Sequence, residues 1–335
     1  MARKSDSTKD ELMAGKALFS VGGSSGLVWN DFLEICKACD DFGYHGFYPS
    51  DHLMLIQPGR GSGLRLEGLT VMAAMSGHTK NLRLGMLVIN NNLRHPVITA
   101  KMINTIDHAS GGRVEMGIGS GNIPAEFEAH GIPWPKFTER LDRLDESLQV
   151  IKALWTEEPA SFDGKYYQLK EAPMMPKPIQ KPYPPIIIGG MGERTMRVAA
   201  KHADDYNQIT SVRQAQANIA KFKAICAEEG RDPAGMRFSV QIPIRLTDDK
   251  SEAENFIANT VETYTRGASH QKSDLYDTVE EHVQDSVLCG DIEAIKEQVD
   301  MWTNAGINHF ILTTPRPFNA PMMEQFSKEI APMFT

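Results

Sequence analysis

Short apolar runs alternate along the chain with longer segments in which apolar residues recur every three or four positions. The runs have the length of β-strands, and the longer segments have the period of helices that cover a sheet. The pattern predicts strands at 16–22, 45–51, 82–89, 113–121, 185–190, 204–209, 237–246 and 309–315. It predicts helices at 29–42, 68–79, 96–110, 137–155, 194–202, 212–229, 251–265 and 291–304.

Eight strand–helix units in succession predict an α/β fold, a (β/α)8 TIM barrel formed by residues 1–335 as a single domain. The strands read as near-continuously apolar, which is typical of parallel strands covered on both faces. The competing architecture is a doubly wound open sheet. It is disfavoured because the Gly-rich stretch 21–26, VGGSSG, lacks the GxGxxG spacing of a dinucleotide fingerprint.

Two stretches interrupt the strand–helix rhythm and predict insertions near 156–185 and 266–287. The first contains seven prolines and a hairpin pattern whose Asp163-Gly164 pair is a strong turn signal. The second is polar throughout. We expect one of these insertions to form a lid over the substrate.

Composition excludes several classes of function. The net charge of −8 comes without a basic stripe, so we expect no nucleic-acid partner. No apolar run approaches the roughly 20 residues of a membrane span, and the first ten residues are polar, so we expect a soluble, cytoplasmic protein. Cys36 and Cys39 form a CxxC inside a helical pattern without a second Cys/His pair, which predicts ordinary helix cysteines and no metal.

Sites in barrels of this kind lie at the carboxyl ends of the strands. The second strand ends at Asp51-His52, and a histidine there either acts on a ligand or merely ends the strand. The first strand ends at Gly22, where a missing side chain lets a flat ligand approach, although a plain turn would also use glycine. The third strand leads to Asn90, the first of three consecutive asparagines.

Two Gly-rich loops follow the fourth and fifth strands. The first contains Gly119, Ser120, Gly121 and Asn122, and the second contains Gly189, Gly190, Met191, Gly192, Arg194 and Thr195. Exposed backbone N–H groups and a helix N-terminus form an anion site, most often for phosphate. One histidine, several amides and a phosphate site suit a reaction whose difficult step belongs to a cofactor.

Five segments together resemble the luciferase-like flavin monooxygenase superfamily, most closely its coenzyme F420-dependent (deazaflavin) oxidoreductase branch. They are PSDHLM, LRLGMLV with RHPVITAKMINTIDHASGGRVEMGIGSG, FTERLDRLDESLQVIKALW, PIIIGGMGERTMRVAAKHADDYN and GINHFILTTP. The resemblance covers residues 16–316. It implies a (β/α)8 barrel with insertions that forms a homodimer.

The resemblance also implies roles for individual residues. His52 would lie over the reactive centre of the cofactor ring, with Asp51 tuning or orienting it, and Leu87-Val88 would form a non-proline cis peptide against the back of the ring. Many deazaflavin enzymes have an acidic residue near position 122, where this chain has asparagine. With the strand-end residues, the predicted cofactor-binding set is Gly22, Leu87, Val88, Asn90, Gly119, Ser120, Gly121, Asn122, Gly189, Gly190, Met191, Gly192, Arg194 and Thr195.

These observations predict a flavin-type oxidoreductase that uses coenzyme F420 to move hydride to or from a small organic substrate, while His52 handles the proton. One alternative is an FMN-dependent monooxygenase, in which reduced FMN from a partner flavin reductase reacts with oxygen. A second alternative is a barrel that binds flavin without catalysis.

Overall fold

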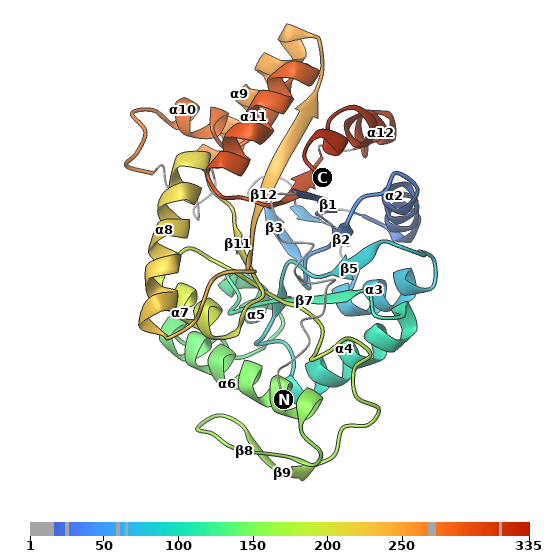
Figure 1. The fold of residues 1–335 in the computed structure, drawn as a ribbon, viewed down its shortest axis with the longest axis vertical. Helices are drawn as coiled ribbons and strands as arrows, with labels where there is room; N and C mark the ends of the chain where they lie inside the picture. Colours follow the sequence, from blue (N-terminus) through green and yellow to red (C-terminus); the bar gives the residue numbers. More distant parts are fainter. Residues whose placement is uncertain (1–16, 24–26, 58–60, 64–65, 267–272, 315–316) are drawn as a thin grey trace.

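The computed structural model describes residues 17–23, 27–57, 61–63, 66–266, 273–314 and 317–335. Strands that pair in parallel close into a barrel, because the last strand pairs with the first (Figure 1). In pairing order they are β1 (Leu18–Gly22), β2 (Gly46–Tyr48), β5 (Arg83–Gly85), β7 (Val114–Gly119), β10 (Ile186–Gly189), β11 (Asp205–Gln208), β12 (Arg237–Leu246) and β14 (His309–Thr313). The predicted (β/α)8 TIM barrel is confirmed.

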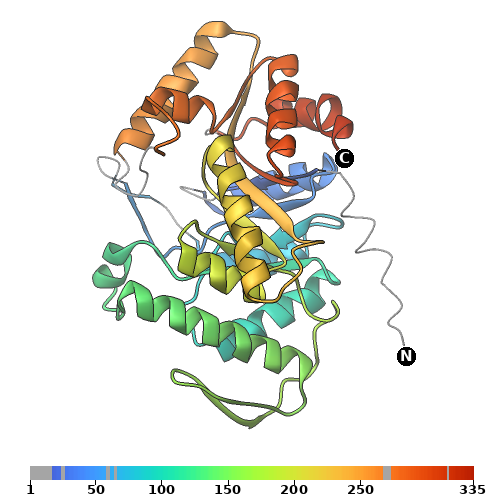
Figure 2. The ribbon, with the colours of Figure 1, turned by 60° about the vertical axis from the view of Figure 1, so that its left-hand side comes forward.

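Helices surround the barrel strands in both ribbon views (Figures 1 and 2). They are α2 (Trp29–Asp41), α3 (Gly68–Ser76), α4 (Pro96–Ser110), α6 (Phe137–Thr156), α7 (Glu193–His202), α8 (Val212–Glu228), α9 (Lys250–Arg266), α11 (Ile292–Asn304) and α12 (Ala320–Glu329). Helix α4 shows how individual residues mark the two ends of a helix. Pro96 occupies its first turn, and Gly111 ends it in the left-handed conformation that glycine tolerates.

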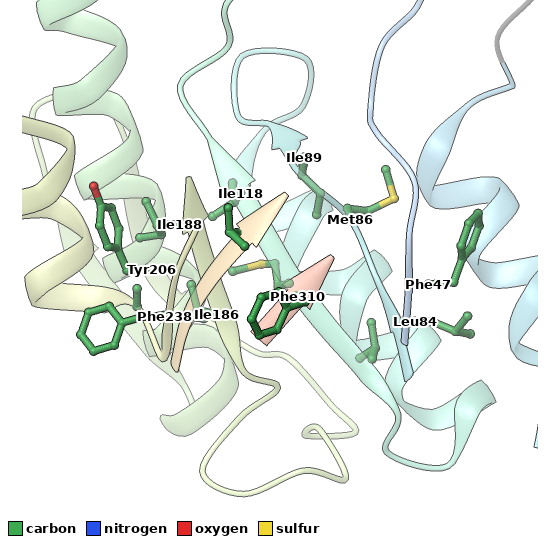
Figure 3. Close-up of a cluster of buried hydrophobic side chains, with 14 of the residues drawn as sticks. Phe47, Leu84, Met86, Ile89, Ile118, Ile186, Ile188, Tyr206, Phe238 and Phe310 are labelled. Carbon is green, nitrogen blue, oxygen red and sulfur yellow. The ribbon is translucent and has the colours of Figure 1, made fainter. Parts of the chain in front are cut away.

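The main hydrophobic core lies between the barrel and these helices. Figure 3 shows part of it. The labelled side chains include Phe47, Leu84, Ile118, Ile186, Ile188, Tyr206, Phe238 and Phe310, which come from β2, β5, β7, β10, β11, β12 and β14. Each of them is at most 5 % exposed. Burying one such side chain stabilises the fold by about 1.5–3 kcal/mol, so this layer holds the helices against the strands.

The inside of the barrel is charged, which corrects the prediction of strands apolar on both faces. Oε1 of buried Glu115 accepts hydrogen bonds from Arg83 Nε at 2.6 Å and Arg237 Nη1 at 2.9 Å. Oε2 accepts from Tyr48 Oη at 2.7 Å and Arg237 Nη2 at 2.9 Å. Burial would raise the pKa of Glu115, but the two guanidinium groups hold it well below its usual range.

A second carboxylate extends this arrangement around the barrel. Asp205 accepts from Ser239 Oγ at 2.6 Å, and its other oxygen lies 3.0 Å from Nδ1 of His309 and 3.3 Å from Nε of Arg237. Nε2 of His309 lies 2.9 Å from Oγ of Ser20. We call the set Ser20, Arg83, Glu115, Asp205, Arg237, Ser239 and His309 the interior network. It joins strands from both halves of the chain.

The first insertion is a hairpin, as predicted, of β8 (Ala160–Asp163) and β9 (Gln168–Ala172). It lies outside α6 in both ribbon views. The chain that follows it is bound to α4, since Asp107 accepts from the backbone N–H groups of Ile179 and Gln180. Nε2 of Gln180 also donates to the carbonyl of Val114, at the amino end of β7. The prediction of a lid over the mouth is therefore wrong for residues 156–185.

The second predicted insertion includes residues 267–272, which lie outside the described residues. Its described part contains α10 (Val279–Gln284), followed by β13 (Leu288–Gly290), which pairs with β12. Asp285 accepts a hydrogen bond from the backbone N–H of Val212 at the start of α8. This excursion therefore lies on the side of the barrel where the carboxyl ends of the strands open.

Several short elements were not predicted: β3 (Leu55–Gln57), β4 (Gly61–Gly63), β6 (Ile89–Asn90), α5 (Pro124–Ala129) and a 3-10 turn (Ala331–Met333). Cys36 and Cys39 are fully buried in α2, and burial raises the pKa of both thiols. They are ordinary helix cysteines, as predicted. Within the described ranges, no helix is long and apolar enough to cross a membrane.

Candidate functional site

Asp51 follows β2 at the carboxyl end of the barrel and is only 2 % exposed. Its carboxylate accepts two hydrogen bonds from the guanidinium of Arg94, at 2.6 and 2.9 Å, and one from the backbone N–H of Asn90 at 3.0 Å. Arg94 also contacts Glu67. Asp51 thus fastens the loop after β5 to the end of β2. The contacts of its carboxylate are thus with Arg94 and Asn90, and the role of Asp51 in tuning or orienting His52 stays a prediction.

The carboxylate that contacts His52 belongs to Glu126, which was not predicted. Nδ1 of His52 lies 3.2 Å from Oε2 of Glu126, and the other oxygen accepts from the backbone N–H groups of Leu53 and Met54. Glu126 is fully buried in α5, in the connection that follows β7. Burial would raise the pKa of Glu126, but the hydrogen bond and charge of His52 and the two N–H groups outweigh burial and lower it.

The peptide bond between Leu87 and Val88 is cis, which confirms the prediction for this position. Leu87 packs inside the barrel with Tyr48, Ile187 and Ile311. A Cβ atom placed on Gly119 would lie 2.7 Å from Cγ2 of Val88. Glycine at 119 is therefore required by the packing of this bend against β7, whatever else the loop binds.

Asparagines after β5 connect this bend to the first Gly-rich loop. Nδ2 of Asn92 donates to the carbonyl of Ser120 at 2.7 Å, and Oδ1 of Asn90 accepts from the backbone N–H of Asn92. Among the residues that the structure describes, the buried Nδ2 atoms of Asn90 and Asn91 have no hydrogen-bond partner. Gly121, at φ +76°, lies against Asn90, because a Cβ there would come within 3.0 Å of Nδ2. A buried amide donor beside this loop is suited to an acceptor atom on a bound ligand.

Arg140 holds the same loop from α6 and was also not predicted. Its Nε donates to the carbonyl of Ser120 at 3.0 Å, and its Nη1 donates to that of Pro135 at 2.9 Å. The guanidinium stacks 3.7 Å from the centre of the Trp134 ring. Asn122, by contrast, is exposed. The loop is therefore positioned mainly through its backbone.

The second Gly-rich loop leads from β10 into α7. Gly192 is the N-cap of α7, and no side chain in the described part of the chain caps this helix end. A Cβ atom on Gly192 would have Oγ1 of Thr195 as its nearest neighbour, at 3.9 Å, and one on Gly189 would meet nothing closer than 3.6 Å. The protein interior does not require glycine at either position. The uncapped N–H groups and the partial positive charge of this helix N-terminus suit an anion.

Other predicted residues lie apart from this group. Arg194 is half exposed and forms an ion pair with Asp142 at 2.8 Å, so its charge already has a partner. Met191 is 46 % exposed. Gly22 lies on the opposite wall, where a cavity of about 300 Å³ is also lined by Gln241 and Thr313. Gly190 contributes a turn at φ +134°.

The structure thus brings together Val88, Asn90, Gly119, Ser120, Gly121 and Gly189, with the N-terminus of α7 beside them. The donor set fits a flat polar ring carrying a phosphate, since Asn90 offers an unpartnered amide and α7 offers free N–H groups. Among the described residues, no group of three or more His, Cys, Asp or Glu side chains could hold a metal ion.

Comparison with known families decides the class. The family model described as luciferase-like monooxygenase matches residues 14–309. The chain belongs to the luciferase-like monooxygenase family. Membership of this luciferase-like family confirms the predicted superfamily and the prediction of an oxidoreductase.

Relatives within the luciferase-like family use two kinds of cofactor. The chain is 26 % identical to the F420-dependent glucose-6-phosphate dehydrogenase of Amycolatopsis mediterranei (strain U-32), over 90 % of this chain and 93 % of the relative. It is 28 % identical to the FMNH(2)-dependent dimethylsulfone monooxygenase of Pseudomonas putida, over 61 % of this chain and 55 % of that protein. A solved F420-dependent secondary alcohol dehydrogenase, bound to an F420-acetone adduct, shares the fold with a TM-score of 0.79 at 22 % identity, covering 94 % of this chain and 98 % of that one.

Proposed function

We propose that this protein is a coenzyme F420-dependent oxidoreductase that moves hydride to or from a small organic substrate. The observation that carries the proposal is the combination of a Gly-rich loop leading into the uncapped N-terminus of α7 with His52 at the same end of the barrel. Similarity supports F420 over FMN, because the F420-dependent relative aligns along 90 % of this chain and the FMN-dependent one along 61 %.

Three groups of residues would hold the cofactor. The bend at Leu87-Val88 would lie behind the ring, Asn90 and the loop 119–122 would contact its polar atoms and the ribityl chain, and the loop 189–195 would bind the phosphate. When bound, the deazaflavin supplies the ring carbon that accepts or donates hydride. The protein contributes binding, orientation and the movement of the proton.

His52 is suited to the proton transfer. Its side chain is 19 % exposed, and Nδ1 is paired with Glu126, so Nε2 is the ring nitrogen that would serve the substrate. A neutral imidazole accepts the proton of a substrate hydroxyl while hydride leaves the adjacent carbon, and an imidazolium returns a proton in the reverse direction. The carboxylates of Asp51 and Glu67 share Arg94 and are less available for this role.

Binding titrations of the purified protein with coenzyme F420 and with FMN test the cofactor. We expect F420 to bind at least tenfold more tightly, a difference of about 1.4 kcal/mol. Turnover of candidate alcohols and carbonyl compounds should proceed without oxygen and change the absorbance of the deazaflavin. Tighter binding of FMN, with turnover that requires oxygen, would contradict the proposal.

That contrary result would support a second function, an FMN-dependent monooxygenase, which the 28 % identity to the Pseudomonas putida enzyme favours. Such an enzyme would need a reductase to supply reduced FMN, and adding one would restore turnover. The homodimer remains a prediction, and gel filtration with light scattering would test it.

A further inference from the structure

One buried carboxylate contacts both the ring of His52 and the backbone beside it. Oε2 of Glu126 lies 3.2 Å from Nδ1 of His52, and Oε1 accepts from the backbone N–H groups of Leu53 and Met54. Glu126 lies 74 positions along the chain from His52 and comes from α5, after a different barrel strand. It therefore sets the position of the histidine relative to the loop after β7.

The nearby carboxylates of Asp51 and Glu67 are paired with Arg94, so Glu126 is the carboxylate whose charge acts on His52. Asp51 accepts both nitrogens of the Arg94 fork, and Glu67 contacts the same guanidinium. Within the described part of the chain, no Arg or Lys forms an ion pair with Glu126; its ion-pair partner is His52. The ring of His130 also faces Glu126, but it contacts the backbone carbonyl at 2.7 Å.

The helix that carries Glu126 is held firmly. Pro124 occupies its first turn, and the buried ring of Phe127 packs 4.5 Å from the centre of the Trp134 ring. Arg140 stacks on the ring of Trp134 and donates a hydrogen bond to the carbonyl of Ser120. Glu126 therefore comes from a braced element, as a group that orients another side chain requires.

We propose that Glu126 is the positioning residue for His52: it accepts the Nδ1 hydrogen, directs Nε2 to the barrel mouth and stabilises the imidazolium that forms during turnover. This inference rests on the proposed function. In the oxidative direction, Nε2 would accept the substrate O–H proton, while a bound deazaflavin would supply the acceptor for the hydride of the adjacent C–H, leaving a carbonyl compound. Glu126 would stay ionised throughout, as the orienting carboxylate does in a Ser-His-Asp triad.

The test compares Glu126→Gln with Glu128→Gln, an exposed residue on the same short helix. The first readout is an NMR titration of the His52 ring in protein without cofactor. Replacing the carboxylate by an amide removes the charge that stabilises the imidazolium, so the midpoint should move to lower pH than in the unmodified protein. Glu128→Gln should leave the midpoint unchanged.

The second readout is turnover against pH in the oxidative direction. In Glu126→Gln, kcat should fall by about 10–10³-fold, because the ring loses its orientation and its charge partner. The rise in rate that accompanies loss of the His52 proton should move to lower pH, while the affinity for the cofactor stays within threefold. Glu126→Asp keeps the charge, so its titration midpoint should lie closer to that of the unmodified protein.

These measurements separate two failures. An unchanged titration midpoint in a folded Glu126→Gln variant, checked by circular dichroism, would overturn the inference whatever the cofactor is. If Glu126→Gln does not fold, a midpoint that drops as far in Glu126→Asp as in Glu126→Ala would overturn it, since the charge would then have no effect. Failure to bind F420 would contradict the proposed function alone, because the titration needs no cofactor.

Discussion

Buried polar groups have different surroundings in the interior network and at the carboxyl end of the barrel. In the interior network, Glu115 receives four hydrogen bonds and Asp205 is bound by a serine, a histidine and an arginine. At the carboxyl end, the amide nitrogens of Asn90 and Asn91 are equally buried, and among the described residues they have no partner. Burying a polar group without a partner costs about 1–3 kcal/mol, and a ligand that accepts from these amides would offset that cost.

Glycines show the same contrast. A Cβ atom on Gly85 would lie 2.3 Å from the ring of Tyr48, so the interior itself demands glycine there. At Gly189 and Gly192 the added atom would find ordinary space. Close packing therefore explains glycine at Gly85 and also at Gly119 and Gly121, whereas packing does not require glycine at Gly189 or Gly192.

The largest expected effect is at the mouth. His52→Ala should lower turnover by about 10²–10⁴-fold, the usual range for a general acid or base. Cofactor affinity should stay within a few-fold, because the ring and phosphate contacts lie in other loops. The measurements are steady-state kinetics and a binding titration, with exposed His108→Ala on α4 as the control. Full activity of His52→Ala would mean that His52 only ends its strand.

In the interior, Glu115→Gln should lower the free energy of unfolding by about 3–5 kcal/mol, since Arg83 and Arg237 would remain buried without their carboxylate. Chemical denaturation measures this change, and surface Glu128→Gln should shift stability by no more than about 0.5 kcal/mol. Cofactor affinity of the folded variant should be unchanged. Weaker cofactor binding with unaltered stability would mean that Glu115 serves the cofactor site and not the stability of the barrel.

The smallest effect is expected at the anion loop. Gly192→Leu should weaken cofactor binding by about tenfold, equivalent to about 1.4 kcal/mol, because the side chain would occupy the approach to the uncapped N–H groups. The fold should survive, since φ at Gly192 is −72° and the nearest atom is 3.9 Å from the new Cβ.

Gly77→Leu is the matched control for the anion loop. Gly77 has a φ of −84°, and the nearest atom to an added Cβ lies at 3.8 Å, but it sits at the end of α3 and not in the loop 189–195. Equal cofactor affinity in the two variants, measured by titration, would show that the loop is an ordinary turn.

The sequence pattern located the barrel strands well but misjudged their inner faces. Arg237, Ser239 and Gln241 alternate with apolar residues in β12, and this period of two was visible in RFSVQI. Arg83 and His309 stand at strand starts, where polar residues also suit a turn. Which charges face one another depends on closure of the barrel, because Glu115 and Arg237 are separated by 122 positions.

The position of the first insertion could have been read from its order in the chain. It follows a helix and precedes a strand, and such connections lie at the amino end of a barrel, away from the loops that follow strands. Glu126 was harder to find, since it lies beyond the Gly-rich loop and its partner is in another βα connection. The local sequence offers only Glu126 next to Phe127, two positions after Pro124, and both side chains are buried in the structure.

The interior network also bears on how the chain can fold as it is synthesised. When β7 has left the ribosome, Glu115 can pair with Arg83, but Arg237 has not yet been synthesised. Asp205 likewise lacks its partner His309 until another 104 residues have been added. A nascent half-barrel would have to bury a carboxylate with only part of its counter-charge. We therefore expect the first four strands to remain hydrated until the last strands have been synthesised, so that the barrel closes in one cooperative step.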